Sequence, residues 1–410
     1  MAVRAWVRVA VALFAVGCSG PEPTESASGL LPVVGVTTVG PLAVTPVLPW
    51  RLDPDPSLRI GGSARGSTHQ FTEISAVLVL PDRSVLVADG RSGPVRRYTP
   101  GGDLLQQLGT VGEGPGEFRS PTSIAGLPGD SVVVWDGALW RASVFDGNGR
   151  FARTVRYDPT ARGIYPLEGM WPMEVRVASG GMRLVRLASK AGGKGGSSGV
   201  TEPMPDAGLA IHPAEARLPQ LIASLPGPEE VEVETPWGVL RLNPPLAAES
   251  KIAFHAPEHR TCVGHQASPE ILCVAQDGTR RGVRWSDARR PVDPNDRTIA
   301  AWRSETIQSF GTKVGEGVAE GIVQRVPVPR YHPAFGNLLF DVLGYLWIEL
   351  GPVDGAATER EYLVVDRELT VAGRFHVPNM ELVDIGADYL MGVRRDGFDV
   401  EEVVKMELTR

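Results

Sequence analysis

Short runs of alternating apolar and polar residues recur along the chain, and clusters of turn residues separate them. Four runs lie between Gly109 and Tyr157, and they read TSIAGL, SVVVWD, RASVFD and RFARTVRY. The clusters PGDS, DGALW and DGNG stand between them, and tight turns favour these residue types. Runs rich in β-branched and aromatic residues with such boundaries are typical of strands. This segment therefore predicts one antiparallel sheet of four strands.

The same pattern occurs once before, at a fixed distance along the chain. Residues 81–104 match residues 128–151 without a gap, at an offset of 47 residues, and Asp89 falls on Asp136. A repeat of this length with several strands per unit is typical of a β-propeller blade. We therefore expect an all-β fold of the propeller type.

The two ends of the chain are expected to share one further blade. Residues 58–71 match residues 106–118, where an outer strand leads into the next sheet, but no three strands precede them. Runs at residues 381–385, 389–394 and 401–408 supply three strands. We expect the N-terminal strand to complete this last blade, which leaves no sheet edge open.

With the shared blade, the prediction is a six-bladed β-propeller over residues 50–410. Five or seven blades also fit, because the third and fourth units are weakly marked. One inserted helix is expected from Asp293, where DPNDRTIAAWRSETIQSFG offers a capping residue, an early proline and apolar residues at helical spacing. The other blades are predicted at residues 72–109, 119–157, 165–242, 247–287 and 333–377.

The N-terminus has the pattern of an export signal. Residues 1–17 hold two arginines and an apolar run over residues 9–16, too short for a spanning helix of roughly 20 residues. The residues before Cys18 resemble a bacterial lipobox, with Ala15 where the usual pattern has leucine. We expect a lipoprotein signal peptide, lipidation of Cys18, and a tether over residues 18–49. An ordinary cleaved signal with an incidental cysteine is the alternative.

This pattern predicts an exported protein of the cell envelope, anchored by lipid and located at the outer membrane if the cell has one. The 410 residues carry a formal net charge of −7, with 42% hydrophobic and 22% charged residues. The sequence shows no stripe of basic residues that could neutralise the phosphates of a nucleic acid and release their counterions. We therefore expect no nucleic-acid partner. We expect a monomer that contacts the membrane through its N-terminal lipid.

The second repeat unit resembles the NHL repeat. The match consists of GEGPGEFRSP before the first strand, followed by Asp136, Arg141 and Phe145. Residues 50–410 as a whole resemble bacterial six-bladed β-propeller lipoproteins, an uncharacterised family. The resemblance implies an exported binding or interaction module. It also implies that Asp136, and Asp89 in the first unit, close a loop by accepting backbone N–H groups. The alternative is that these carboxylates bind calcium at the channel mouth, as in propeller lactonases.

Candidate ligand contacts lie in two classes of loop, those that precede first strands and those that join second to third strands. In a propeller both classes lie on one face. The residues are Arg119, Trp140, Arg141, Arg330, Tyr331 and His332. Aromatic residues with arginine are typical of binding hot spots, and arginine pairs with carboxylates, so we expect a protein or a small anionic ligand. The alternative is that Trp140 packs with Phe118 between blades while Arg141 braces a loop through Asp136.

One cluster of metal-binding residue types occurs, at His255, His259, Cys262 and His265. Pro257 prevents a helix that would align the first two, and residues three apart face opposite sides of a strand. We therefore expect no metal and no cofactor.

Cys262 and Cys273 are the cysteines that remain once Cys18 is modified. They lie on adjacent predicted strands, in a protein expected to reach an oxidising compartment. We expect a disulfide between them. Two buried free thiols are the alternative, because a register slip of one residue would turn the side chains to opposite faces.

These observations favour a membrane-anchored binding module, because no catalytic pair stands out among the 48 acidic residues. The alternative is a propeller enzyme that acts at the central channel, either a calcium-assisted hydrolase of the lactonase kind or an NHL-type lyase. Such an enzyme would need several carboxylates or histidines that converge on the channel.

The Cys18→Ala variant should leave the membrane fraction. Acyl chains contribute about 0.8 kcal/mol per buried CH₂ group, so the several chains of a lipoprotein anchor hold a domain that one chain would release. Cell fractionation followed by immunoblotting measures the effect. Unchanged membrane association of the variant would contradict the prediction.

Overall fold

The structure is a computed structural model. It describes residues 33–63, 70–91, 93–156, 170–178, 182–189, 202–203, 207–212, 220–226, 229–286, 290–293, 296–351, 358–398 and 400–410. All of these belong to the second of the chain's two compact units, Leu31–Arg410. The expected signal peptide, Cys18 and the first part of the expected tether lie outside the described residues.

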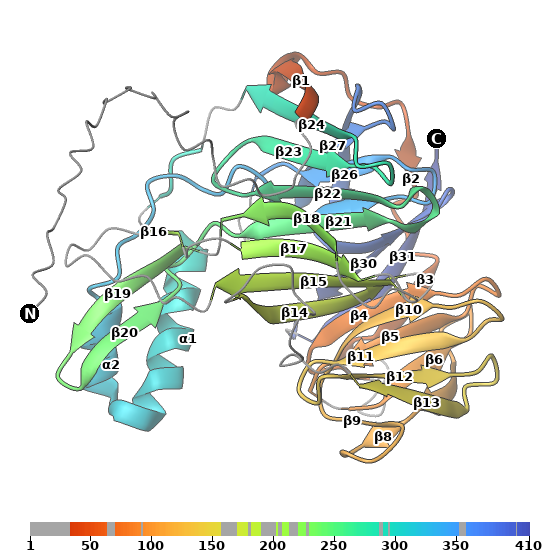
Figure 1. The fold of residues 1–410 in the computed structure, drawn as a ribbon, viewed down its shortest axis with the longest axis horizontal. Coiled ribbons are helices and arrows are strands. Elements are labelled where there is room, and N and C mark those ends of the chain that lie inside the picture. The colour runs from red at the N-terminus through yellow and green to blue at the C-terminus, as the bar shows by residue number, and fades with distance from the viewer. Residues whose placement is uncertain are drawn as a thin grey trace, which may run out of the picture. The chain divides into compact units, whose positions relative to one another are not determined.

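Most described residues belong to antiparallel sheets of consecutive strands, and each sheet takes the name of its first strand (Figure 1). The β4 sheet contains β4 (Ile74–Val79), β5 (Val85–Asp89), β6 (Val95–Tyr98) and β7 (Leu104–Leu108). The β10 sheet contains β10 (Pro121–Gly126), β11 (Val132–Asp136), β12 (Arg141–Phe145) and β13 (Phe151–Arg156). The β14 sheet contains β14 (Met170–Ala178), β15 (Met182–Ser189), β17 (Ala207–His212) and β18 (Gln220–Leu225).

The second half of the chain continues the series. The β21 sheet contains β21 (Ser250–His255), β22 (Arg260–His265), β23 (Glu270–Val274) and β24 (Arg280–Ser286). The β25 sheet contains β25 (Leu338–Phe340), β26 (Leu346–Glu349), β27 (Glu359–Val365) and β28 (Val371–Pro378). The β29 sheet contains β29 (Glu381–Ile385), β30 (Tyr389–Arg395) and β31 (Glu401–Thr409). Smaller elements are β8 (Thr110–Val111), β9 (Glu117–Phe118), η1 (Leu42–Val44) and η5 (Ala256–Glu258).

The first strands of neighbouring sheets contact one another. Strand β4 contacts β10 and β29, strand β25 contacts β21 and β29, and β10 also contacts β14. Sheets of consecutive antiparallel strands arranged around their first strands are the architecture of a β-propeller. The mostly β fold expected from the sequence is confirmed, with two α-helices in the described part of the chain.

Apolar cores lie between neighbouring sheets. Between the β25 and β29 sheets, the ring of Trp347 lies 5.8 Å from Trp50, 5.9 Å from Tyr362 and 5.7 Å from Phe375, measured between centroids. Aromatic pairs at these distances contribute about 0.5–1.5 kcal/mol beyond the burial of their surface. The β25 and β29 sheets therefore depend on each other for a buried face.

The first described strands line the outer edges of three sheets (Figure 1). Strand β1 (Val33–Pro41) pairs in parallel with β24. The N–H of Leu48 donates to the carbonyl oxygen of Arg374 on β28 at 2.8 Å. Strands β2 (Arg51–Leu52) and β3 (Leu58–Gly61) both pair antiparallel with β31.

The tether expected over residues 18–49 therefore includes a structured part. Residues 33–49 supply backbone partners to β24 and β28, which would otherwise present unpaired N–H and C=O groups at a sheet edge. Alternating β-branched residues in VVGVTTVG suit this edge position. Residues 33–48 are thus hydrogen-bonded to two of the sheets.

The insertion after the β21 sheet holds two helices instead of the single one expected. Helices α1 (Arg297–Val314) and α2 (Glu316–Val323) are separated by Gly315, whose φ of 91° interrupts the helical backbone. The N-cap is Asp296, whose carboxylate accepts a first-turn N–H at 2.8 Å, and not the expected Asp293.

A separate β-hairpin contacts these helices (Figure 1). Strands β19 (Glu229–Thr235) and β20 (Gly238–Leu242) pair with each other, and β16 (Glu202–Pro203) joins the edge of β19. The sequence assigned this hairpin to a third blade over residues 165–242, but the β14 sheet ends at β18. The shared apolar core contains Val231, Val233, Ile322 and Val326.

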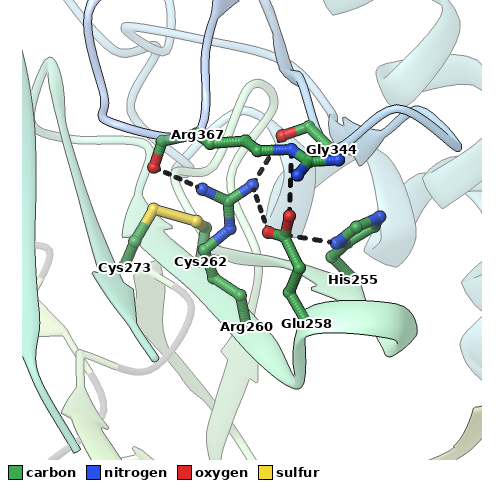
Figure 2. Close-up of a disulfide and its surroundings, with 7 residues drawn as sticks. All are labelled: His255, Glu258, Arg260, Cys262, Cys273, Gly344 and Arg367. Atoms are coloured by element: carbon green, nitrogen blue, oxygen red, sulfur yellow. Dashed lines mark hydrogen bonds and ion pairs between the residues drawn. A yellow bond between two sulfur atoms is a disulfide. The ribbon is translucent and has the colours of Figure 1, made fainter. Parts of the chain in front are cut away.

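Arg260 links the β21 sheet to the β25 sheet (Figure 2). Its buried guanidinium donates to the carbonyl oxygens of Arg367, at 2.7 Å, and Gly344. It also lies 4.8 Å from the ring centroid of Phe340 and pairs with Glu258 at 3.1 Å. Burial lowers the pKa of Arg260, and the Glu258 carboxylate acts against that shift.

Cys262 and Cys273 form a disulfide between β22 and β23 (Figure 2). The two residues lie directly opposite each other in the strand register, with Cα atoms 4.0 Å apart. Both are buried in the core that the β21 and β25 sheets share. The register turns both side chains to the same face, as the disulfide requires.

Removing this disulfide should destabilise the protein by roughly 2–3 kcal/mol, since it closes a short loop of the unfolded chain. The Cys262→Ser, Cys273→Ser double variant should unfold at a lower urea concentration than the parent protein. Thiol titration in denaturant should find no free thiol in the exported Cys18→Ala protein before reduction. Two free thiols before reduction would contradict the pairing.

His255 is buried beside Arg260. It is 4% exposed, and its Nδ1 lies 3.3 Å from Oε2 of Glu258 (Figure 2). Burial lowers the pKa of His255 below 6.5; Glu258 opposes this shift, and the nearby Arg260 and Arg367 reinforce it. Protonation is therefore easier in the unfolded chain than in the folded one.

The free energy of unfolding should fall as the pH drops below about 6.5, because His255 must then take up a proton on unfolding. His255 should change the free energy of unfolding by no more than about 1.4 kcal/mol per pH unit. Urea unfolding between pH 7 and pH 5 measures it. The His255→Gln variant should lose this component, whereas His259→Asn, at an exposed left-handed turn, should keep it. Equal pH slopes for both variants would contradict the assignment.

Candidate binding site

A polar cavity of about 450 Å³ lies among the first strands of five sheets. Strands β4, β10, β21, β25 and β29 supply its walls, so it is the central channel of the propeller. Its polar lining consists of Ser75, Thr122, Ser123, Glu249, Ser250, Lys251, Asn337 and Glu381. These residues stand at or next to the beginnings of their strands. The cavity therefore lies at the face where the first strands begin, which we name the start face.

Asp89 and Asp136 hold the segments that lead into the first strands. The carboxylate of Asp136 accepts the backbone N–H groups of Arg119 at 2.7 Å and Ser120 at 3.2 Å, just before β10. Asp89 accepts the N–H of Thr72 at 2.9 Å, just before β4. Both aspartates are fully buried at the end of the second strand. The loop-closing role implied by the resemblance is confirmed.

In two further sheets, longer side chains accept the backbone N–H group that precedes the first strand. The Gln266 amide oxygen accepts the N–H of Glu249 at 3.1 Å, just before β21. The Glu349 carboxylate accepts the N–H of Asn337 at 3.0 Å, just before β25. These contacts give the channel residues defined positions, because each lead-in segment is tied to its own second strand.

The channel offers donors and acceptors together. Nζ of Lys251 donates to the Glu249 carboxylate, which keeps the ammonium beside a negative charge. The Ser75 hydroxyl donates to the carbonyl oxygen of Pro121, which joins the β4 and β10 sheets at the mouth. With one ammonium, two carboxylates, an amide and several hydroxyls, the lining can exchange hydrogen bonds with a polar ligand.

The first group of predicted contacts lies around the β10 sheet. Arg119 is exposed and pairs with Glu113 at 2.8 Å. Trp140 is half-buried and packs edge-on against Trp135, with centroids 6.3 Å apart. Arg141 is 7% exposed, so it cannot serve as an open contact. The bracing alternative is correct for Arg141, but the guanidinium acts on carbonyl oxygens of Glu113, Gly114 and Glu117 instead of on Asp136.

The second group lies beside the beginning of α1. Arg330 is exposed and Tyr331 is 48% exposed. His332 is only 6% exposed, and its Nε2 lies 3.5 Å from the Asp296 carboxylate. The candidate contacts thus divide into exposed residues (Arg119, Arg330 and Tyr331) and buried or packed ones (Trp140, Arg141 and His332).

The sequence interpretation did not select the channel residues, although one signal for them was present. Ser75 and Thr122 are 47 positions apart, the same offset as the repeat, and both line the channel. Aligned polar residues near the beginning of two first strands could therefore have indicated the channel lining. The contributions of Glu249, Asn337 and Glu381 come from units with no such alignment.

The candidate metal ligands do not fit a metal site. Within the described ranges, no group of three or more His, Cys, Asp or Glu side chains could hold a metal ion. Cys262 is committed to the disulfide, and the Asp89 and Asp136 carboxylates accept backbone N–H groups. The two aspartates thus have structural partners in the segments that lead into β4 and β10.

No protein-family model and no curated protein matches the sequence. Among solved structures, a member of the DUF4221 family from Bacteroides vulgatus is 9% identical, with a TM-score of 0.49 over 88% of this chain and 99% of that chain. A gluconolactonase from Xanthomonas campestris is 16% identical, with a TM-score of 0.41 and the same two coverages. Virginiamycin B lyase from Staphylococcus aureus is 10% identical, with a TM-score of 0.40 over 88% and 99%. These scores are too low to support any inference about function.

None of the described helices is both long and apolar enough to cross a membrane.

Asp136→Ala should destabilise the protein by roughly 3–5 kcal/mol, because it removes a fully buried carboxylate and leaves its four backbone N–H partners without an acceptor. Those groups include Arg119, Ser120, Ala138 and Leu139. Urea unfolding measures the loss. Asp146→Ala removes a turn carboxylate that also accepts two N–H groups but is not buried, and it should cost roughly 1 kcal/mol. Equal effects of the two substitutions would contradict the special role of Asp136.

Proposed function

We propose that this chain is an exported, lipid-anchored β-propeller that binds a small hydroxylated ligand at the mouth of its central channel. The observation that carries the proposal is the cavity of about 450 Å³, within the range of ligand pockets, with polar side chains from five sheets. Its lining contains both donors and acceptors, which suits a sugar-like or polyol ligand better than an apolar one.

The proposed ring has six blades, and β3 completes the blade formed by β29, β30 and β31. The pairing of Arg59 with Val404 and Ile60 with Val403 supports this, as does the contact between β29 and β4. A ring closed by hydrogen bonds between distant parts of the chain has no open edge there. It would hold the channel mouth in one geometry.

A second part of the proposal concerns larger partners. Arg119, Arg330 and Tyr331 are exposed in loops that precede first strands, so they are proposed contacts for a protein or an anionic partner at the start face. The lipid on Cys18 and NHL-like lipoprotein character remain part of the proposal, and they rest on the N-terminal pattern and on the repeat motif.

The experiment is calorimetric titration of the full-length protein in detergent with glucose, gluconate and glucosamine, which are a neutral, an anionic and a cationic probe. At least one of them should bind. Lys251→Met removes the only ammonium of the described lining and should weaken binding at least tenfold, since a hydrogen bond to a charged group is worth about 1.5–3 kcal/mol. Glu368→Gln, on an exposed turn, is the matched control and should bind as the parent does.

Four outcomes decide the proposal. Loss of binding in Lys251→Met alone supports the channel. Failure of all three probes, or equal binding by both variants, overturns it. Turnover of a sugar lactone with loss of activity in Lys251→Met would replace the binding module by the propeller-enzyme alternative.

A further inference from the structure

A second, larger cavity lies away from the channel, where the β29 sheet meets strand β3. Its volume is about 820 Å³, within the range of small-molecule sites. We name it the arginine pocket, after Arg59 of β3 and Arg394 and Arg395 of β30, which line it together with Phe398 and Glu402. None of its lining residues belongs to the channel.

A buried carboxylate orients two of the arginines. Glu402 is 6% exposed, and its Oε1 accepts from Nη1 of Arg59 at 3.2 Å and from Nε of Arg394 at 2.7 Å. Within the described part of the chain, no other hydrogen bond or ion pair of these two guanidinium groups is found. Each guanidinium has five N–H donors, so a pair of neighbouring N–H groups remains on both for a second carboxylate.

An exposed aromatic ring stands beside these cations. Phe398 is 80% exposed, the most exposed of the large apolar side chains in the described ranges. Its turn is ordered by Asp396, whose carboxylate accepts the backbone N–H groups of Ser63 at 2.7 Å, Phe398 at 2.9 Å and Val400 at 3.1 Å. Hydrogen bonding from Ser63 lowers the pKa of Asp396. The ring is therefore held at the pocket by a defined turn while its apolar surface stays in water.

The unused donors of the pocket favour an anion. Of its three arginines, Arg395 is paired with Glu401 at 3.0 Å. The carboxylates of Glu402 and Asp396 are already engaged by guanidinium and backbone N–H groups, so neither neutralises the remaining N–H donors. A carboxylate ligand can form paired hydrogen bonds with a guanidinium fork, and a flat apolar group can cover an aromatic ring. A ligand with both features would satisfy the unused donors and remove the exposed ring from water.

We propose that the arginine pocket is a binding site for a small organic carboxylate with a flat apolar face. The carboxylate pairs with Arg59 and Arg394, and the flat group stacks on Phe398. The site joins β3 to β30 and β31, so a bound ligand links the N-terminal strand to the C-terminal sheet. Binding therefore stabilises the folded chain against unfolding.

Calorimetric titration of the full-length protein in detergent with benzoate tests the site, with benzyl alcohol and acetate as probes that lack the charge or the ring. Benzoate should bind at least tenfold more tightly than either. Arg394→Gln should weaken benzoate binding at least tenfold, and Phe398→Ala should weaken it about fivefold. Arg284→Gln removes a comparable ion pair, with Glu270 on the β21 sheet, and should leave the affinity unchanged.

Phe398→Ala guards against a folding artefact, because the side chain is exposed and the melting temperature should stay within a degree or two of the parent value. Loss of benzoate affinity at an unchanged melting temperature supports the site. Absence of benzoate binding, equal affinity for benzyl alcohol, or full affinity in Phe398→Ala overturns it.

Discussion

The structure depends on one recurring requirement, that the backbone N–H groups leading into each first strand must find acceptors. These segments precede the strands, so the hydrogen bonds between paired strands cannot satisfy their N–H groups. A backbone N–H group that loses water without gaining an acceptor destabilises the folded state. Asp89, Asp136, Gln266 and Glu349 meet the requirement in four sheets, each from the end or just beyond the end of a second strand. Because the channel residues stand next to these bonds, the same contacts that permit the turn also position the candidate binding site.

Packing between the sheets is the second condition, and it works through residues from distant parts of the chain. The aromatic cluster around Trp347 includes Trp50, nearly 300 positions away in the sequence. Arg260, on β22, donates hydrogen bonds to carbonyl oxygens of the turns that join β25 to β26 and β27 to β28. Strand β1 adds to the edge of β24, and β3 adds to β31. The N-terminal segment thus takes part in several sheets at once, so a change in it would affect sheets far away along the chain.

The two cavities differ in how they could recognise a ligand. The channel collects short polar side chains near the beginnings of first strands, whose backbone the sheets hold in place. The arginine pocket is built from the ends of strands and a turn, where long cationic side chains are oriented by one buried carboxylate. Rigid strands suit several weak hydrogen bonds that must act together, whereas a preorganised guanidinium fork suits one strong contact. The scaffold is shared, and the two sites differ in the side chains that the sheets present to them.

Local pattern was sufficient to predict the mostly β fold and the sheet around Asp136, and the resemblance to the NHL repeat indicated the loop-closing aspartates. These features depend on strand alternation and on contacts within about 30 residues. The pairing of Cys262 with Cys273 was also within reach, since one hairpin contains both residues. Only the tertiary structure decided which side chains meet from different sheets. Arg59 and Arg394 look like ordinary charged strand residues, and they become a pair because Glu402, buried between them, accepts from both. Contacts of this kind produce no periodic pattern in the sequence, because the residues that form them are far apart along the chain. Each residue alone is also compatible with several other roles.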